Sequence, residues 1–215
     1  MKNNDDSGAG MENAGMENKI LEIARHLFLE KGFSKTSTTE IAKAAGCNQA
    51  LVHYYFRTKE KLFCRIFKAQ VSVFASAFLD EGNNPGKTFE ERLRHRIGRH
   101  FEIISGVPKL PALILSDMIE NEGRIKLLKE SVGDIPLKVF DTLNKELKTE
   151  IENGNIRPIS AKDLMINILS LNIFLFLALP VFSTIFELDE KHKQEMLLQR
   201  KEEIINTIIL SLRPL

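Results

Sequence analysis

Apolar residues recur along most of this chain at the three- and four-residue spacing of an amphipathic α-helix, and nowhere in a sustained period of two. Helix-ending residues such as Gly32, Gly46, Gly154 and Pro180 separate these stretches. The pattern predicts helices near 18–31, 37–45, 49–56, 58–79, 88–106, 110–122, 124–131, 135–153, 160–179 and 189–212. We therefore expect an all-α protein of nine or ten helices.

The segment 37–56 carries the most specific local pattern. Ser37 and Glu40 have the spacing of a capping box, which begins a helix. Gly46 can adopt the positive φ that ends this helix, and Asn48 can cap the next one. Two short helices joined by a tight turn form a helix-turn-helix, whose second helix enters the major groove of DNA.

Over residues 20–68 the chain resembles the DNA-binding domain of the TetR-type (TetR/AcrR) family of transcriptional regulators. The matching residues are Thr36-Ser37-Thr38-Thr39-Glu40-Ile41-Ala42, Ala45-Gly46-Cys47-Asn48 and Tyr54-Tyr55-Phe56-Arg57-Thr58-Lys59-Glu60-Lys61-Leu62. Cys47, Leu51 and His53 depart from the residues usual in the family. The resemblance implies a homodimer with an N-terminal three-helix domain for operator DNA and a larger helical domain that binds an effector.

The charge distribution agrees with a DNA-binding role for this region. The formal net charge is only +1, yet residues 19–68 carry ten Lys or Arg against four Glu, or +6. Residues 1–18 carry −3 and residues 69–215 carry −2. A positive charge concentrated on one domain is typical of nucleic-acid binding. We expect a disordered tail over 1–18, a DNA-binding domain over 19–68, and an effector-binding and dimerisation domain over 69–215.

Candidate DNA contacts lie at helix starts. The second helix of the motif presents its first residues to base edges, where Gln49 can pair bidentately with adenine and Leu51 can touch a thymine methyl group. The N-terminus of the preceding helix favours a phosphate. The resemblance implies backbone contacts for Tyr54 and Lys59. The full candidate set is Ser37, Thr38, Thr39, Gln49, Ala50, Leu51, His53, Tyr54 and Lys59.

The later helices suggest two further surfaces. A cavity among the helices of the second domain would suit a small-molecule effector of unknown identity. Its candidate lining residues, chosen by helix face, are Phe101, Met118, Phe140, Asn172 and Phe174. The resemblance implies that the last two long helices form a four-helix bundle with those of a second copy. The candidate interface residues are Ile168, Leu171, Leu175, Ile204, Ile208 and Leu212.

A basic cluster lies on one helical face between residues 92 and 100 and consists of Arg92, His95, Arg96 and Arg99. We interpret it as a solvated face with acidic neighbours. An anionic effector or a zinc ion is the alternative ligand for this cluster.

Other classes of protein find less support in the sequence. Leu164–Phe182 is apolar enough to suggest a membrane span, but Asn167 and Pro180 interrupt it, and we expect a buried helix without membrane contact. Two cysteines without a metal-binding spacing fit a reducing cytoplasm, and we expect neither a metal nor another cofactor. An all-α enzyme using His95 or His100 lacks a nucleophile–base spacing.

These observations predict a sequence-specific DNA-binding transcriptional regulator that is not an enzyme. We expect a repressor that a small molecule releases from a pseudo-palindromic operator in double-stranded DNA. The alternative is a helix-turn-helix regulator that acts without an effector, either constitutively or through a protein partner.

Overall fold

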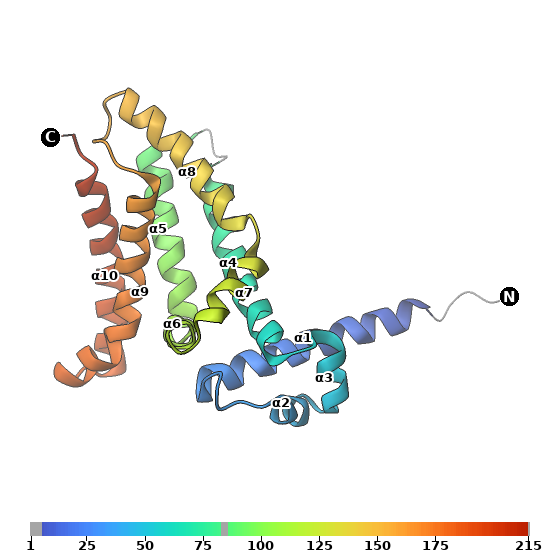
Figure 1. The fold of residues 1–215 in the computed structure, drawn as a ribbon. Helices are drawn as coiled ribbons and strands as arrows, with labels where there is room; N and C mark the ends of the chain where they lie inside the picture. The colour runs from blue at the N-terminus through green and yellow to red at the C-terminus, as the bar shows by residue number, and fades with distance from the viewer. Residues whose placement is uncertain (1–5, 83–85, 215) are drawn as a thin grey trace. The chain divides into compact units, whose positions relative to one another are not determined.

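The computed structural model describes residues 6–82 and 86–214, and every regular element in these two ranges is helical (Figure 1). The predicted all-α fold is therefore confirmed. The helices are α1 (Asp6–Lys31), α2 (Thr38–Ala45), α3 (Gln49–Phe56), α4 (Lys59–Gly82), α5 (Phe89–Gly106), α6 (Leu110–Glu120), α7 (Glu122–Val132), α8 (Ile135–Glu152), α9 (Ala161–Ile185) and α10 (Glu190–Ser211).

Two helices extend further than the sequence pattern predicts. α1 begins at Asp6, so residues 6–18 are helical where we expected disorder, while residues 1–5 lie outside the described part. Alanine, methionine and glutamate are good helix formers, and extending a helix costs less than nucleating one. α9 continues through Pro180 to Ile185, because a proline removes only one intrahelical hydrogen bond and the flanking turns keep theirs.

Side-chain caps set the starts of the helices that carry the candidate site. The hydroxyl of Ser37 accepts a hydrogen bond from the N–H of Glu40 at 3.1 Å, and Oδ1 of Asn48 accepts one from Leu51 at 2.8 Å. The predicted capping box at α2 forms only on the Ser37 side, because the carboxylate of Glu40 pairs with Lys31 instead. That pairing also lowers the pKa of Glu40.

The chain folds into two compact units. The N-terminal unit comprises Met1–Ala69 and Leu113–Ser131, and the C-terminal unit comprises Gln70–Ala112 and Val132–Leu215. The segment 113–131 therefore belongs with the helix-turn-helix, although its place in the sequence led us to expect it in the second domain. Helix α4 runs through the boundary without a break.

An aromatic cluster forms part of the core of the N-terminal unit. The rings of Phe28, Phe33 and Phe63 lie with their centroids 5.2 to 5.9 Å apart. The guanidinium of Arg124 on α7 lies 3.9 Å from the centroid of the Phe33 ring, and its Nε lies 2.8 Å from a carboxylate oxygen of Asp117. Both charged side chains are buried, and their ion pair lies within segment 113–131. The contact of Arg124 with Phe33, and its guanidinium 3.9 Å from a carboxylate oxygen of Glu60, join this segment to the rest of the unit.

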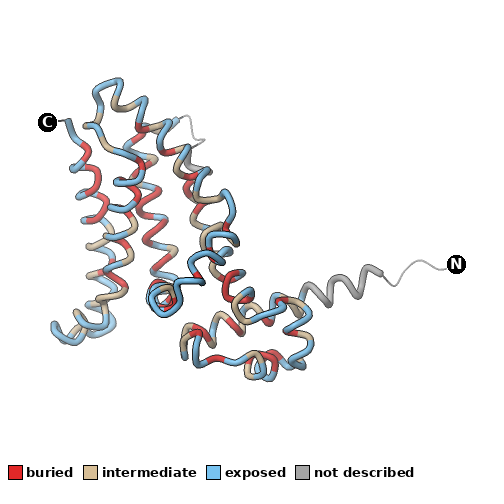
Figure 2. The backbone as a smooth tube through the Cα atoms, viewed as in Figure 1, coloured by how far each residue is buried: buried red, intermediate tan, exposed pale blue. Residues whose placement is uncertain are grey.

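In the C-terminal unit, α5 packs against both α9 and α10 (Figures 1 and 2). Arg96 of α5 is fully buried, which corrects the solvated-face interpretation for this residue, whereas His95 and Arg99 are exposed as predicted. Its guanidinium donates to both carboxylate oxygens of Glu146, at 2.6 and 2.8 Å, and to the carbonyl oxygen of Phe78 at 3.1 Å. A planar guanidinium can be buried when a bidentate carboxylate and a carbonyl use its donors.

Candidate nucleic-acid interface

Helix α3 separates a buried face from an exposed one. Val52 and Phe56 are buried in the N-terminal unit and anchor the helix, as their apolar spacing predicts. Four candidate contact residues, Gln49, Ala50, His53 and Tyr54, are exposed, and the fifth, Leu51, is half-buried. The exposed side chains are therefore available for base edges, as a recognition helix requires.

A polar pocket of about 470 Å³ lies in the N-terminal unit at the start of α2. Its lining residues are Ser34, Lys35, Thr36, Ser37, Thr38, His53, Arg57, Thr58, Lys59 and Glu60. Ser37 and Thr39 are exposed and Thr38 is half-buried, so the first turn of α2 is open to solvent. Free N–H groups at a helix N-terminus, with hydroxyls and cations around them, suit a phosphate group.

The ammonium group of Lys59 is used inside the protein. Its Nζ donates to the carbonyl oxygens of Phe33 and Thr36, at 3.0 and 2.9 Å, and lies 4.2 Å from the centroid of the Phe33 ring. This differs from the backbone contact with DNA that we expected. Lys59 instead holds the loop that leads into α2, and so positions the phosphate pocket.

Sequence reasoning missed two cations of this pocket. Lys35 and Arg57 are both exposed and line it. Lys35 precedes Ser37, the cap of α2, and Arg57 follows Phe56 at the end of α3. Neither residue lies at the start of a helix, where the sequence predicts DNA contacts. Arg57 has a φ of +64°, an uncommon conformation for a residue other than glycine, which only the three-dimensional structure reveals.

A chain of hydrogen bonds links the pocket to the recognition helix. Nε2 of Gln49 donates to Oγ1 of Thr38 at 3.0 Å and lies 3.3 Å from Nε2 of His53. Nδ1 of His53 lies 2.9 Å from the carbonyl oxygen of Arg57. The side chain of Gln49 is therefore held in place before any DNA is present.

The five candidate effector residues do not surround one cavity within either unit. Met118 belongs to the N-terminal unit and the others to the C-terminal unit. There Phe101 and Asn172 are buried, Phe140 is half-buried, and Phe174 is 62% exposed. Each residue was chosen from the predicted inward face of its own helix. The face of a helix does not indicate which other helices pack against it.

A buried polar contact nevertheless connects α5 and α9 within the C-terminal unit. Nδ2 of Asn172 donates to the carbonyl oxygen of Ile97 at 3.3 Å and lies 2.8 Å from Nδ1 of His100. Burial lowers the pKa of His100 to about 4. Oδ1 of Asn172 is buried and has no hydrogen-bond partner among the described residues.

The structure corrects the candidate dimer interface. Five of the six residues, Ile168, Leu175, Ile204, Ile208 and Leu212, are buried in the core of the C-terminal unit itself, and Leu171 is half-buried. α9 and α10 are apolar on more than one face, and the spacing of apolar residues pointed to the face that is buried within the unit itself. The large apolar side chains that α9 and α10 expose are Ile166, Phe174, Val181, Ile185, Leu198 and Leu210.

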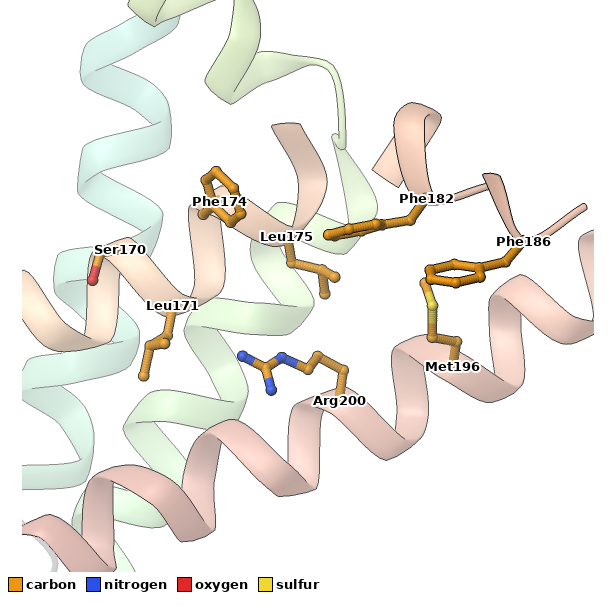
Figure 3. Close-up of a pocket in the computed structure, with 8 residues that line it drawn as sticks. All are labelled: Ser170, Leu171, Phe174, Leu175, Phe182, Phe186, Met196 and Arg200. Atoms are coloured by element: carbon orange, nitrogen blue, oxygen red, sulfur yellow. The ribbon is translucent and has the colours of Figure 1, made fainter. Parts of the chain in front are cut away.

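An apolar groove of about 550 Å³ lies between α9 and α10, and the exposed ring of Phe174 forms part of its lining (Figure 3). The rings of Phe182 and Phe186 stack at its end, with centroids 6.2 Å apart. The groove is lined by Ser170, Leu171, Phe174, Leu175, Phe182, Phe186, Met196 and Arg200.

The side-chain arrangement also bears on metal binding and on membrane insertion. Within residues 15–79 and 86–214, no three His, Cys, Asp or Glu side chains lie close enough together to hold a metal ion. Lys59–Leu79 and Ala161–Ile185 are long and apolar enough to cross a membrane, a property that core helices of soluble proteins share.

Comparison with known proteins places the helix-turn-helix in a family. Residues 20–66 match the family of bacterial regulatory proteins described as the tetR family. The fatty acid metabolism regulator protein of Bacillus subtilis (strain 168) is 24% identical over 139 residues, which cover 65% of this chain and 70% of that protein. The regulator AcrR of Shigella flexneri is 28% identical over 137 residues, covering 62% of this chain and 63% of AcrR.

Solved structures share the fold over nearly the whole chain. A putative fatty acid metabolism regulator from Clostridium perfringens superposes with a TM-score of 0.70 at 18% identity, covering 90% of this chain and 98% of that one. FadR from Bacillus subtilis, solved in complex with stearoyl-CoA, superposes with a TM-score of 0.66 at 17% identity. The superposition covers 91% of this chain and 98% of that one. These relatives are regulators and not enzymes. Residues 20–66 thus form a helix-turn-helix domain that matches the tetR family of bacterial regulatory proteins.

Proposed function

We propose that this chain is a cytoplasmic, sequence-specific DNA-binding regulator that acts as a homodimer on a pseudo-palindromic operator. One observation carries the proposal: the exposed face of α3 lies beside a polar, partly cationic pocket at the N-terminus of α2. α3 enters the major groove with Gln49, Ala50, Leu51 and His53 toward the bases.

The phosphate backbone contacts the start of α2 in this proposal. The N–H groups and hydroxyls of Ser37, Thr38 and Thr39 bind one phosphate, and Lys35 and Arg57 supply the positive charge. Tyr54 is 65% exposed and contacts the backbone next to it. Lys59 contributes indirectly, since it holds the loop before α2.

Selection from a randomised duplex library tests this function. The full-length protein should enrich a pseudo-palindrome, which it binds more tightly than a scrambled duplex by about a thousandfold or more at physiological salt. Fluorescence anisotropy measures both affinities. Equal affinity for the enriched and the scrambled duplex contradicts sequence-specific binding.

The exposed apolar face of α9 and α10 supports the proposed homodimer. Six large apolar side chains on these helices are between 52% and 67% exposed, and one of them, Phe174, also lines the apolar groove. Large apolar side chains exposed in this number are typical of a protein–protein interface. A second copy related by a two-fold axis would present the same surface to it.

The proposed effector is a small, largely apolar molecule that releases a repressor from its operator. The names of two relatives, a fatty acid metabolism regulator and FadR with stearoyl-CoA, make long-chain acyl-CoA the first class to assay. An effector should raise the melting temperature by mass action and weaken operator binding about 5- to 150-fold. Unchanged operator affinity with every ligand that stabilises the protein would favour the effector-independent alternative.

A further inference from the structure

A chain of polar contacts follows the exposed side of α3, and the donor and acceptor of each contact are fixed by its chemistry. It runs from Thr38 on α2 through Gln49 and His53 to the backbone of Arg57, with successive distances of 3.0, 3.3 and 2.9 Å. Each member is either a candidate DNA contact or lines the phosphate pocket. The directions of these hydrogen bonds decide what Gln49 can offer to a base.

The carbonyl oxygen of Arg57 determines the tautomer of His53. A carbonyl oxygen only accepts, so Nδ1 of His53, 2.9 Å away, carries the hydrogen and donates it. In the neutral ring Nε2 is then an acceptor. It can face the amide nitrogen of Gln49 but not the amide oxygen, because two acceptors would repel each other. The orientation of the Gln49 amide follows from this tautomer.

Both hydrogens of the Gln49 amide are therefore used within the protein. One is donated to Oγ1 of Thr38 and the other to Nε2 of His53. The oxygen Oε1 is the part of the amide left for DNA. We propose that Gln49 reads its base as a hydrogen-bond acceptor only. His53 and Thr38 determine this specificity because they fix the orientation of the Gln49 amide. This inference rests on the proposed function and deepens it.

An acceptor-only side chain reads a different set of bases from a free glutamine. In the major groove the amino groups of cytosine (N4) and adenine (N6) donate, while guanine and thymine present acceptors. A free glutamine also donates to N7 of adenine and so prefers adenine. Affinities for DNA with cytosine or adenine at this position should therefore differ by no more than about threefold. DNA with guanine or thymine there should bind about tenfold more weakly. This replaces the bidentate adenine contact that the sequence predicts.

The test is a comparison of base preferences selected by the full-length protein and four variants. Gln49→Ala flattens the preference at one base pair in each half-site and so identifies the position. His53→Phe removes the ring acceptor, frees one amide hydrogen and should shift that position toward adenine over cytosine by about tenfold. Gln49→Glu, which can only accept, should keep the preference for cytosine and adenine. His26→Phe is the matched control, because His26 is an exposed histidine on α1 and should change nothing.

The possible outcomes separate the inference from the function on which it rests. A wild-type preference for adenine over cytosine of tenfold or more overturns the inference, and so does an unchanged preference in His53→Phe. If Gln49→Ala alters no position, Gln49 reads no base and the inference also fails. In each of these results the protein still selects a sequence. A wild-type protein that enriches no sequence contradicts the proposed function itself.

Discussion

At the residue scale, Arg57 combines a strained backbone with a charged side chain at the candidate phosphate pocket. Its φ of 64° and ψ of −54° make it the centre of a γ-turn, across which the N–H of Thr58 donates to the carbonyl oxygen of Phe56 at 2.7 Å. Such a conformation costs a residue other than glycine about 1–3 kcal/mol. Our hypothesis is that the protein tolerates this strain because the guanidinium binds DNA.

Replacing Arg57 should therefore separate stability from DNA binding. Arg57→Gly should stabilise the protein by about 1 kcal/mol, because glycine adopts positive φ without strain. It should also weaken binding to all sequences and lower the slope of log affinity against log salt by about one. Denaturant unfolding and anisotropy at several salt concentrations measure the two effects. Arg57→Ala is the control, which loses the charge but keeps the strain. DNA affinity that is unchanged in both variants would remove Arg57 from the interface.

At the scale of elements, the contact between His100 and Asn172 connects α5 and α9 and makes the fold sensitive to acid. Burial lowers the pKa of His100 from 6.5 to about 4. Between these values the unfolded chain binds a proton that the folded chain does not, so stability falls as the pH falls from 6.5 to 4. At about pH 7.5 and above both states are largely neutral at this group, and the full stability is present.

The free energy of unfolding should fall by about 3 kcal/mol as the pH falls through the range set by the two pKa values of His100. His100→Gln cannot titrate and keeps a polar partner for Asn172, so its stability should fall less steeply over the same range. Urea unfolding at pH 7, 6, 5 and 4.5 gives both curves. His26→Gln, which changes an exposed ring, should follow the wild type. Parallel curves for wild type and His100→Gln would show that another group causes the acid sensitivity.

At the scale of the whole molecule, the proposed homodimer can be tested at the exposed apolar side chains of α9 and α10. Leu198 on α10 is 67% exposed, whereas Ile208 on the same helix is 1% exposed and packs in the core of its own unit. Charges at these two positions should therefore act differently, one on association and the other on folding.

Leu198→Glu should leave the fold intact and weaken the dimer about a hundredfold, since burying an unpaired carboxylate costs about 3 kcal/mol or more. Operator binding should fall with it. Leu137→Glu is the matched control, because Leu137 is 60% exposed on α8, away from this face. Ile208→Asp should instead unfold the C-terminal unit. Sedimentation velocity and circular dichroism distinguish these results, and an undisturbed dimer in Leu198→Glu would place the interface elsewhere.

The secondary structure and the helix-turn-helix could be predicted from the sequence, because both depend on residues close together in the chain. The caps at Ser37 and Asn48 each join residues three apart, and the starts of α2 and α3 follow from them. The period of 3.6 residues places buried Val52 opposite exposed Ala50 and Tyr54. The helical residues 6–18 were not predicted because the sequence there lacks an apolar stretch at helical spacing.

The partner of each buried or paired side chain could not be predicted, because it depends on how distant segments pack. Lys59 and Arg96 both resemble solvated cations in the sequence, yet carbonyls 23 and 26 residues away hold Lys59, and a carboxylate 50 residues away holds Arg96. α9 and α10 are apolar on two faces, so the inward position of Ile208 became known only once α5 was packed against them. Helix formation depends on contacts within about four residues, whereas burial and ion pairing depend on segments that the sequence pattern does not bring together.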